Sequence, residues 1–258
     1  MTSINTSSYE QIYLAYRSVG QSADLIVPAV ALNFVALIGI MLNGTVLFVT
    51  IKSSSLRGSA NFLMTLICLC ELVHQIGHTF FLVVVISGTN FVSLLTADLI
   101  MAPSIFALNC GLMAMLCAAV DRLFAVALPF KHSAIFIKYK YSYLVVYLFI
   151  CVIYGIYAVN YVLEFAIENA GIKSTGFVAE TLQGNVWRFF FNSAFILCCS
   201  VFCYLAIFLI IRCKKGVTQQ TSTRVLRSLS IILLINIGGY LITLAMYRFI
   251  DIISSIFG

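Results

Sequence analysis

The sequence predicts an all-α integral membrane protein, and three observations support this prediction. Hydrophobic residues make up 62% of the 258-residue chain and charged residues only 9%, whereas a soluble domain carries about 25% charged residues. The mean hydropathy is +1.07 over the whole chain, which excludes a soluble enzyme with one apolar helix attached. The apolar runs are long and continuous, unlike the alternating segments of about ten residues that form a membrane β-barrel. A helical bundle also satisfies its backbone hydrogen bonds within each segment, as lipid requires.

Six stretches are long enough to cross the hydrocarbon layer, which takes about 20 apolar residues in a helix. They cover residues 26–51, 61–87, 94–127, 141–165, 185–211 and 225–246. The loops between them are short, and the longest covers about residues 164–184. The chain therefore divides into an N-terminal tail (1–23), one transmembrane bundle (24–250) and a short C-terminal tail (251–258).

The spans carry different signals at their ends. The first span must act as the insertion signal, because residues 1–20 show no basic start followed by an apolar run. Tyr139, Tyr141 and Tyr143 stand at the start of the fourth span, and Trp187 stands at the start of the fifth. Aromatic rings are enriched at membrane–water interfaces, so these positions support the predicted boundaries.

Lys and Arg lie mostly on one side of the predicted bundle. Eleven fall in the first, third and fifth loops and four on the opposite side, and basic loops face the cytosol. We therefore predict a multi-pass plasma-membrane protein, surrounded by membrane lipids, with an extracellular N-terminus. Asn5 in the sequon Asn5-Thr6-Ser7 is then a glycosylation site. The net charge of +6 does not indicate a nucleic-acid partner, because the basic residues form neither a patch nor a known binding motif.

A stripe of polar side chains lies within the second span. Glu71 is followed by His74, Gln75 and His78, and these offsets place all four on one helical face. The stripe must face the bundle interior, because ionisable groups in lipid are costly. Three interpretations remain open: a structural hydrogen-bond network that includes Asn43, a ligand-sensing or ion-linked switch, and a metal site at the two histidines. The metal site is disfavoured, since a hydrolytic motif has Glu directly after the first His.

No enzyme motif stands out in the sequence. A Ser, His and Asp set and a Gly-rich phosphate loop are both missing, so we predict no enzymatic activity, no cofactor and no metal. The alternative function is a proton- or ion-coupled transporter or channel that uses Glu71, His74 and His78. Internal repeats and broken helices, which mark many transporters, are not seen in the sequence.

The most specific motif lies at the inner end of the third span. Asp121 and Arg122 are adjacent there, and Pro129 follows seven residues after the arginine. This pattern resembles the rhodopsin-like seven-helix receptors. Further matches to that family, in order along the chain, are Asn43, Leu56-Arg57, Asn61, Glu71 and Tyr204. Within that superfamily, residues 70–78 and 121–124 look like the nematode serpentine chemoreceptors of class SX.

The resemblance implies a G-protein-coupled receptor that detects a small molecule, located in a sensory cilium. A ligand enters from outside between spans three, five and six, span six swings away from span three, and a heterotrimeric G protein binds in the cleft. The switch residues implied by the family are Asp121, Arg122, Pro129 and Tyr204. The candidate ligand pocket comprises Ser104, Leu108, Asn109, Asn192 and Tyr240. An amine ligand is disfavoured, because amine receptors carry an acid where this chain has Ser104.

Two of the departures of this sequence from the receptor pattern bear on the expected fold. No Cys lies at the top of the third span or within residues 164–184, so the family's outer disulfide is not expected. Only residues 248–258 follow the sixth span, so a rhodopsin-like bundle of six helices, with the seventh missing, is expected. Asn43, Glu71 and His78 would then face an open side of the bundle. A homodimer or heterodimer could cover that side.

Overall fold

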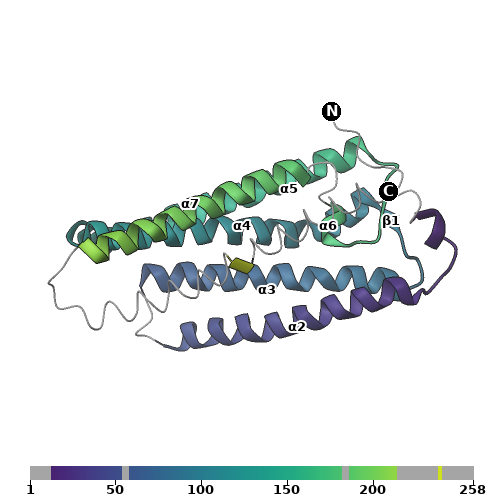
Figure 1. Ribbon diagram of the computed structural model, residues 1–258, viewed down its shortest axis with the longest axis horizontal. Coiled ribbons are helices and arrows are strands. Elements are labelled where there is room, and N and C mark those ends of the chain that lie inside the picture. Colours follow the sequence, from purple (N-terminus) through teal and green to yellow (C-terminus); the bar gives the residue numbers. More distant parts are fainter. Residues whose placement is uncertain (1–12, 54–57, 182–185, 214–237, 240–258) are drawn as a thin grey trace.

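The computed structural model describes residues 13–53, 58–181, 186–213 and 238–239. Five long helices in these ranges lie lengthwise along one another (Figure 1). They are α2 (Ala23–Lys52), α3 (Ser59–Ile86), α4 (Leu94–Ala127), α5 (Pro129–Glu168) and α7 (Val186–Cys213). Each contains a segment that is long and apolar enough to cross a membrane, so the predicted all-α membrane bundle is confirmed. Of the sixth predicted span, 225–246, only Gly238 and Gly239 are described, and both are helical; the rest of that span lies outside the described residues.

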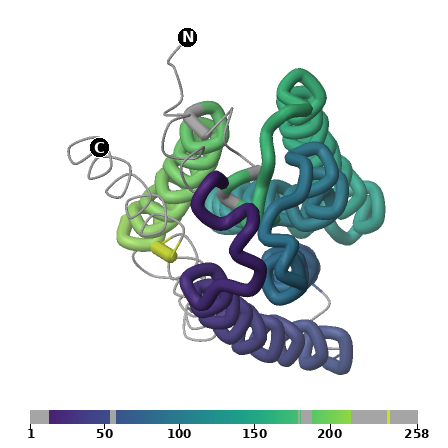
Figure 2. The backbone as a smooth tube through the Cα atoms, turned by 90° about the vertical axis from the view of Figure 1, so that its right-hand side faces the viewer, coloured from purple at the N-terminus to yellow at the C-terminus, as the bar shows by residue number. Residues whose placement is uncertain are grey.

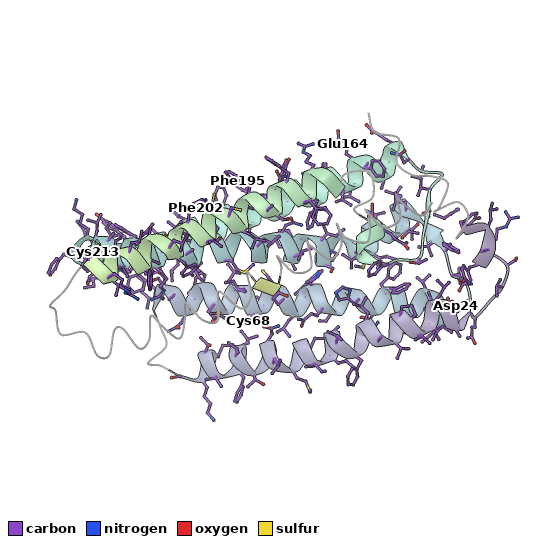
Figure 3. The ribbon with its side chains drawn as sticks, viewed as in Figure 1. Asp24, Cys68, Glu164, Phe195, Phe202 and Cys213 are labelled. Atoms are coloured by element: carbon purple, nitrogen blue, oxygen red, sulfur yellow. The ribbon has the colours of Figure 1, made fainter. Side chains whose placement is uncertain are left out.

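The outer surface of the bundle is apolar. Phe195 and Phe202 on α7 point away from the neighbouring helices (Figure 3) and are 62% and 70% exposed. Helices that carry apolar residues on all sides are typical of membrane spans. The exposed side chains therefore face lipid rather than water.

The helix α4 lies at the centre of the bundle. It packs against α3, α5 and α7, and 61% of its most apolar stretch is buried, compared with 17–28% in the other four long helices. Its buried residues include the small side chains of Ala114, Cys117, Ala118 and Ala119, which let neighbouring helices approach closely. Figure 2 views the bundle end-on and shows α2 at its edge, where it packs against α3.

The contact between α4 and α5 depends on Gly155. A Cβ added there would lie 2.7 Å from two ring carbons of Phe106 and 3.1 Å from its backbone oxygen. The ring could rotate, but the backbone oxygen of a central helix cannot move away cheaply. Glycine therefore sets the distance between these two helices.

The helix α5 begins well before the predicted fourth span of 141–165. Pro129 occupies its first turn, where proline is favoured because its fixed φ suits a helix start. The backbone at Tyr139 is non-helical (φ −128°, ψ 34°), so α5 consists of two segments that meet at a kink. The sequence prediction missed residues 129–138, because their Lys, His and Ser side chains interrupt the apolar run.

A small two-stranded sheet closes one end of the bundle. The strand β1 (Val92–Ser93) pairs antiparallel with β2 (Lys173–Ser174), and the short helix α6 (Val178–Thr181) follows β2. Glu180 accepts hydrogen bonds from the Ser174 hydroxyl (2.9 Å), the Thr175 amide (2.6 Å) and the Thr175 hydroxyl (2.9 Å). All nine cysteines are free. Backbone pairing and Glu180 therefore hold this loop, in place of a disulfide.

Asn90 ties the N-terminal segment to the same end. Its φ of 57° is a left-handed conformation that asparagine tolerates better than most residues. The buried amide Nδ2 donates to the carbonyl oxygens of Tyr16 (2.9 Å) and Gly20 (2.5 Å). The Tyr16 hydroxyl donates to Asp24 (3.0 Å), and this hydrogen bond raises the pKa of Tyr16. Residues 13–24 are therefore anchored beside the sheet.

Candidate functional site

Asp121 lies at the end of α4 opposite the sheet, and three other side chains contact its carboxylate. The residue is fully buried, with an exposed fraction of 0%. The Tyr143 hydroxyl donates to Oδ1 (2.8 Å), the Ser59 hydroxyl donates to Oδ2 (3.0 Å), and His132 Nε2 lies 3.2 Å from Oδ1. These partners come from the start of α3 and from both segments of α5. Asp121 therefore connects three helices through its hydrogen bonds.

The neighbouring Arg122 is held more loosely. Its Nε atom lies 3.9 Å from Asp121 Oδ2, which is longer than a hydrogen bond. Tyr204 of α7 belongs to the same core cluster as Cys117 and Ala118 of α4. The Tyr204 hydroxyl is buried and has no hydrogen-bond partner within the described ranges. Because other donors satisfy Asp121, Arg122 can move without leaving a buried carboxylate unpaired.

Pro129 and the first segment of α5 lie at this same end. The His132 ring packs against Phe124 and Tyr143, at centroid distances of 5.5 and 5.9 Å. These contacts fix the first segment of α5 against the end of α4. Phe130, directly after the proline, is 90% exposed. Phe130 is thus a large, exposed apolar side chain close in sequence to Asp121 and Arg122.

The polar stripe of α3 contacts both α2 and α4. His74 Nδ1 lies 3.0 Å from the Ser104 hydroxyl of α4, which also donates to the His74 carbonyl oxygen (3.0 Å). The Asn33 amide of α2 donates to the carbonyl oxygen of His78 (3.1 Å). The two histidine rings lie 5.0 Å apart, edge to face. These contacts join three helices, as a structural network does.

The other members of the predicted stripe lie nearby on α2 and α3. The Gln75 side chain occupies the space beside Gly39 of α2, while Asn43 and Glu71 are half-buried. Among the described residues, no group of three or more His, Cys, Asp or Glu side chains could hold a metal ion. An ion-linked role for the stripe stays a prediction.

The predicted ligand-pocket residues are only partly brought together. Ser104 faces α3 through its bonds to His74, and the buried Asn109 amide donates to the Ile105 carbonyl oxygen of its own helix (2.8 Å). Leu108 and Asn192 are half-buried on α4 and α7. Tyr240, like the glycosylation site Asn5, lies outside the described residues. A ligand-binding role for these residues stays a prediction.

Asp98 near the start of α4 is a buried acid that the sequence-based site prediction did not include. Its exposed fraction is 0%, and neither carboxylate oxygen has a hydrogen-bond partner in the part of the chain that the structure describes. Met101 and Ile105 follow on the same helical face and pack with Val162 of α5 and Val178 of α6. An acid within an apolar span is a signal of function, the same signal that marks Glu71 in the sequence.

Comparison with known families gives one match. The family model of the serpentine type 7TM GPCR chemoreceptors Srsx matches residues 36–255. No curated protein matches the chain. The family match confirms the resemblance seen in the residues around Asp121 and along the second span, and it is a match to receptors rather than to enzymes or transporters. Because it covers most of the 258 residues, the chain belongs to the Srsx family of serpentine seven-transmembrane GPCR chemoreceptors.

Proposed function

We propose that this protein is a plasma-membrane chemosensory receptor that activates a heterotrimeric G protein when Arg122 leaves Asp121. Family membership supports the receptor class. The observation that carries the switch is the set of donors around Asp121: Tyr143, Ser59 and His132 contact the carboxylate at 2.8–3.2 Å, while Arg122 lies at 3.9 Å. Arg122 is therefore the partner that can leave at the lowest cost.

The Asp121 end of the bundle is the cytoplasmic end in this proposal. Lys52 and Arg212 lie at the ends of α2 and α7 on this side, Lys131 lies in the first turn of α5, and Lys138 and Lys140 flank the kink of that helix. Basic residues in short loops set membrane orientation through the positive-inside rule. The sheet end then faces outside, together with the N-terminus.

In the switch, Arg122 exchanges the Asp121 carboxylate for a new partner. The Tyr204 hydroxyl of α7 is the candidate, because it is buried, lacks a hydrogen-bond partner among described residues and belongs to a core cluster that includes residues of α4. Movement of the predicted sixth span away from α4 makes room for the G protein. The exposed Phe130 supplies an apolar contact for that partner at the same end.

At the outer end, Asp98 is a suitable contact for a small ligand. A buried carboxylate without a donor is unfavourable, because burial removes its hydration without replacing it. A ligand that carries a hydrogen-bond donor would supply the missing partner. We therefore assign Asp98 to ligand recognition, beneath the loop of β2 and α6, together with the residues predicted from the sequence.

Guanine-nucleotide exchange tests the switch without a known ligand. The full chain is reconstituted with representatives of each Gα class, and basal exchange is measured. Asp121→Asn should raise basal exchange, because it weakens the charge that retains Arg122, whereas Arg122→Ala should abolish exchange. Arg212→Ala is the matched control. It removes an exposed arginine at the end of α7 that lies on the Asp121 side of the bundle. Unchanged exchange in both Asp121 and Arg122 variants, with every Gα class, would contradict the proposed switch.

A further inference from the structure

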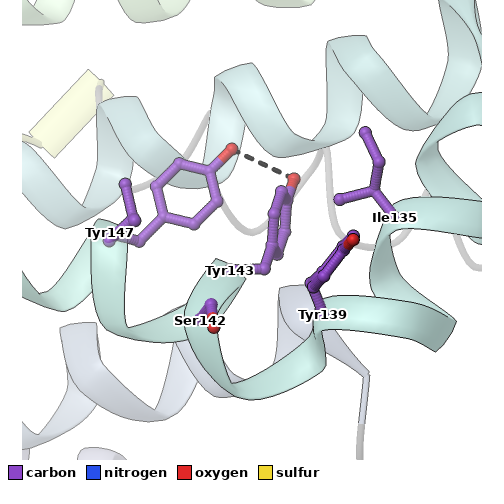
Figure 4. A pocket seen from close by; sticks show the side chains of 6 residues that line it. Ile135, Tyr139, Ser142, Tyr143 and Tyr147 are labelled. Carbon is purple, nitrogen blue, oxygen red and sulfur yellow. Dashed lines mark hydrogen bonds between the residues drawn. The ribbon is translucent and has the colours of Figure 1, made fainter.

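A groove of about 310 Å³ lies along α5 at the kink, near Asp121 in the fold. Its lining residues come from both segments of the helix and are Ile135, Tyr139, Ser142, Tyr143, Val146 and Tyr147 (Figure 4). The surface inside is almost wholly apolar. Small-molecule pockets begin at about 300 Å³, so the groove holds a slender apolar segment rather than a bulky ligand.

The groove opens on the lipid-facing side of α5. Tyr139 and Val146 on its rim are exposed, as are Tyr141 and Val145 beside it. None of the described residues that line it is charged. An occupant that arrives from the membrane as a hydrocarbon chain fits this lining, whereas a soluble polar molecule would lose its hydration without gaining hydrogen bonds.

Three lysines lie close in sequence to the groove, and one of them contacts a lining residue. Lys131, Lys138 and Lys140 lie in or next to the first segment of α5, and no Asp or Glu occurs between Asp121 and Glu164. The ammonium of Lys138 lies over the Tyr139 ring at 5.1 Å, and that of Lys140 lies over the Phe136 ring at 5.7 Å. Lys131 and Lys138 are exposed. Basic clusters next to a membrane span attract anionic headgroups.

The inner wall of the groove is also part of the Asp121 cluster. Tyr143 lines the groove with its ring, and its hydroxyl donates to Asp121 (2.8 Å) and lies 3.1 Å from the Tyr147 hydroxyl. Figure 4 shows the two tyrosines side by side in the groove. Anything that fills the groove therefore supports the tyrosine that holds Asp121.

We propose that this groove binds one acyl chain of an anionic phospholipid, with Lys138 and Lys140 holding its headgroup phosphate. The bound lipid stabilises the first segment of α5 and keeps Tyr143 on Asp121. The proposed lipid site depends on the proposed function in one respect. The Asp121 end must face the cytosol, because anionic lipids are concentrated in the cytoplasmic leaflet. Lipid binding can be measured with no ligand and no G protein present.

Native mass spectrometry of the purified full chain tests the site with phosphatidylserine as the probe. Phosphatidylcholine with the same acyl chains is the neutral control lipid. Lys138→Gln/Lys140→Gln should weaken phosphatidylserine binding by about five-fold for each lysine and leave phosphatidylcholine unaffected. Lys52→Gln removes a lysine at the same end, outside the groove, and should have no effect.

A second pair of variants tests the acyl chain. Val146→Trp fills the groove and should reduce phosphatidylserine binding by roughly ten-fold, whereas Val145→Trp, on the neighbouring exposed face, should not. Both positions are exposed, so neither change disturbs the core. Hydrogen exchange of residues 129–140 should also slow when phosphatidylserine binds.

Several results would overturn the proposal. Equal affinity for both lipids would exclude headgroup recognition, and equal loss in the two tryptophan variants would exclude the groove. Competition by glycerophosphoserine as effective as that by the whole lipid would show that the acyl chain plays no part. Tighter binding of cholesterol at the same groove would assign it to a sterol. Unchanged exchange of residues 129–140 would exclude stabilisation of the α5 segment.

Discussion

Asp121 and Asp98 are two buried acids on the same helix, and they differ in their hydrogen bonding. Asp121 is contacted by three side chains from two other helices. Its buried carboxylate therefore has hydrogen-bond partners, and these partners also join the helices. Asp98 has no partner among the described residues. Proteins commonly accept such a loss of stability at binding sites, because the missing partner is the ligand.

Replacement of Asp98 should stabilise the protein. Asp98→Asn removes an ionisable group that lacks a donor and should raise the free energy of unfolding by about 1–3 kcal/mol, seen as a higher thermal midpoint in detergent. Glu164→Gln, an exposed acid at the outer part of α5, should leave the midpoint unchanged. A lower midpoint for Asp98→Asn would instead show that the carboxylate stabilises the unliganded fold.

Tyr143 should restrain the receptor through its hydroxyl. Tyr143→Phe keeps the ring but removes a hydrogen bond to a buried carboxylate, an interaction that contributes about 1.5–3 kcal/mol. Basal guanine-nucleotide exchange should therefore rise by about ten-fold or more. Tyr154→Phe, at a half-buried tyrosine on the same helix, is the control. Basal exchange equal in the two variants would contradict a restraining role.

At the scale of elements, α4 and α5 are joined by two different devices. Near the middle of the bundle, Gly155 lets α5 approach the backbone of α4 at Phe106. Near the Asp121 end, the kink at Tyr139 turns the first segment of α5 so that His132 and Tyr143 both reach Asp121. The helix α5 is thus held against α4 by close packing at Gly155 and by the hydrogen bonds of Asp121.

Gly155→Ala should weaken the α4–α5 contact. The new methyl group would lie 2.7 Å from the Phe106 ring and 3.1 Å from its backbone oxygen, and overpacking of this kind costs about 1–3 kcal/mol. Gly44→Ala on α2 is the matched control, since nothing lies within 4 Å of its added Cβ. That change should be neutral or should stabilise the helix by up to about 1 kcal/mol. Equal thermal midpoints for the two variants would show that α5 shifts without cost.

At the scale of the whole molecule, the two ends of the bundle differ in chemistry. The sheet end is closed by backbone pairing, Asn90 and Glu180, while the Asp121 end carries basic residues and the exposed Phe130. In the proposed function, this difference separates the end that meets the ligand from the end that meets a cytosolic partner.

The charge distribution makes a prediction about topology. Asn5 should carry a glycan, so Asn5→Gln should remove a mass shift that a glycosidase also removes. An epitope tag inserted after Gly216 should be protected from protease in intact cells, because the distribution of Lys and Arg predicts that this loop is cytosolic. The same tag at the N-terminus should be cleaved. Cleavage of the tag after Gly216 would reverse the proposed orientation.

Much of the fold could be predicted from the sequence, because membrane spans depend on local properties. Long apolar runs indicated helices α2, α3, α4 and α7 to within a few residues, and the motif at Asp121 and Arg122 indicated the receptor family. The first segment of α5 was missed, since its polar residues conceal a helix whose formation depends on contacts with α4. The sequence-based site prediction left out Asp98, although an acid within an apolar span is visible in the sequence. Only the folded chain shows that its carboxylate has no hydrogen-bond partner among the described residues.

What the sequence by itself determined is the class of protein: an apolar helical bundle with a receptor motif at one end. Only the tertiary structure decided which groups hold that motif. Ser59, His132 and Tyr143 lie 62, 11 and 22 residues from Asp121 along the chain, so no local pattern relates them to it. They meet because α3 and α5 pack against the same central helix and α5 bends at Tyr139. Hydrogen bonds between distant residues follow from packing, which a sequence pattern does not encode.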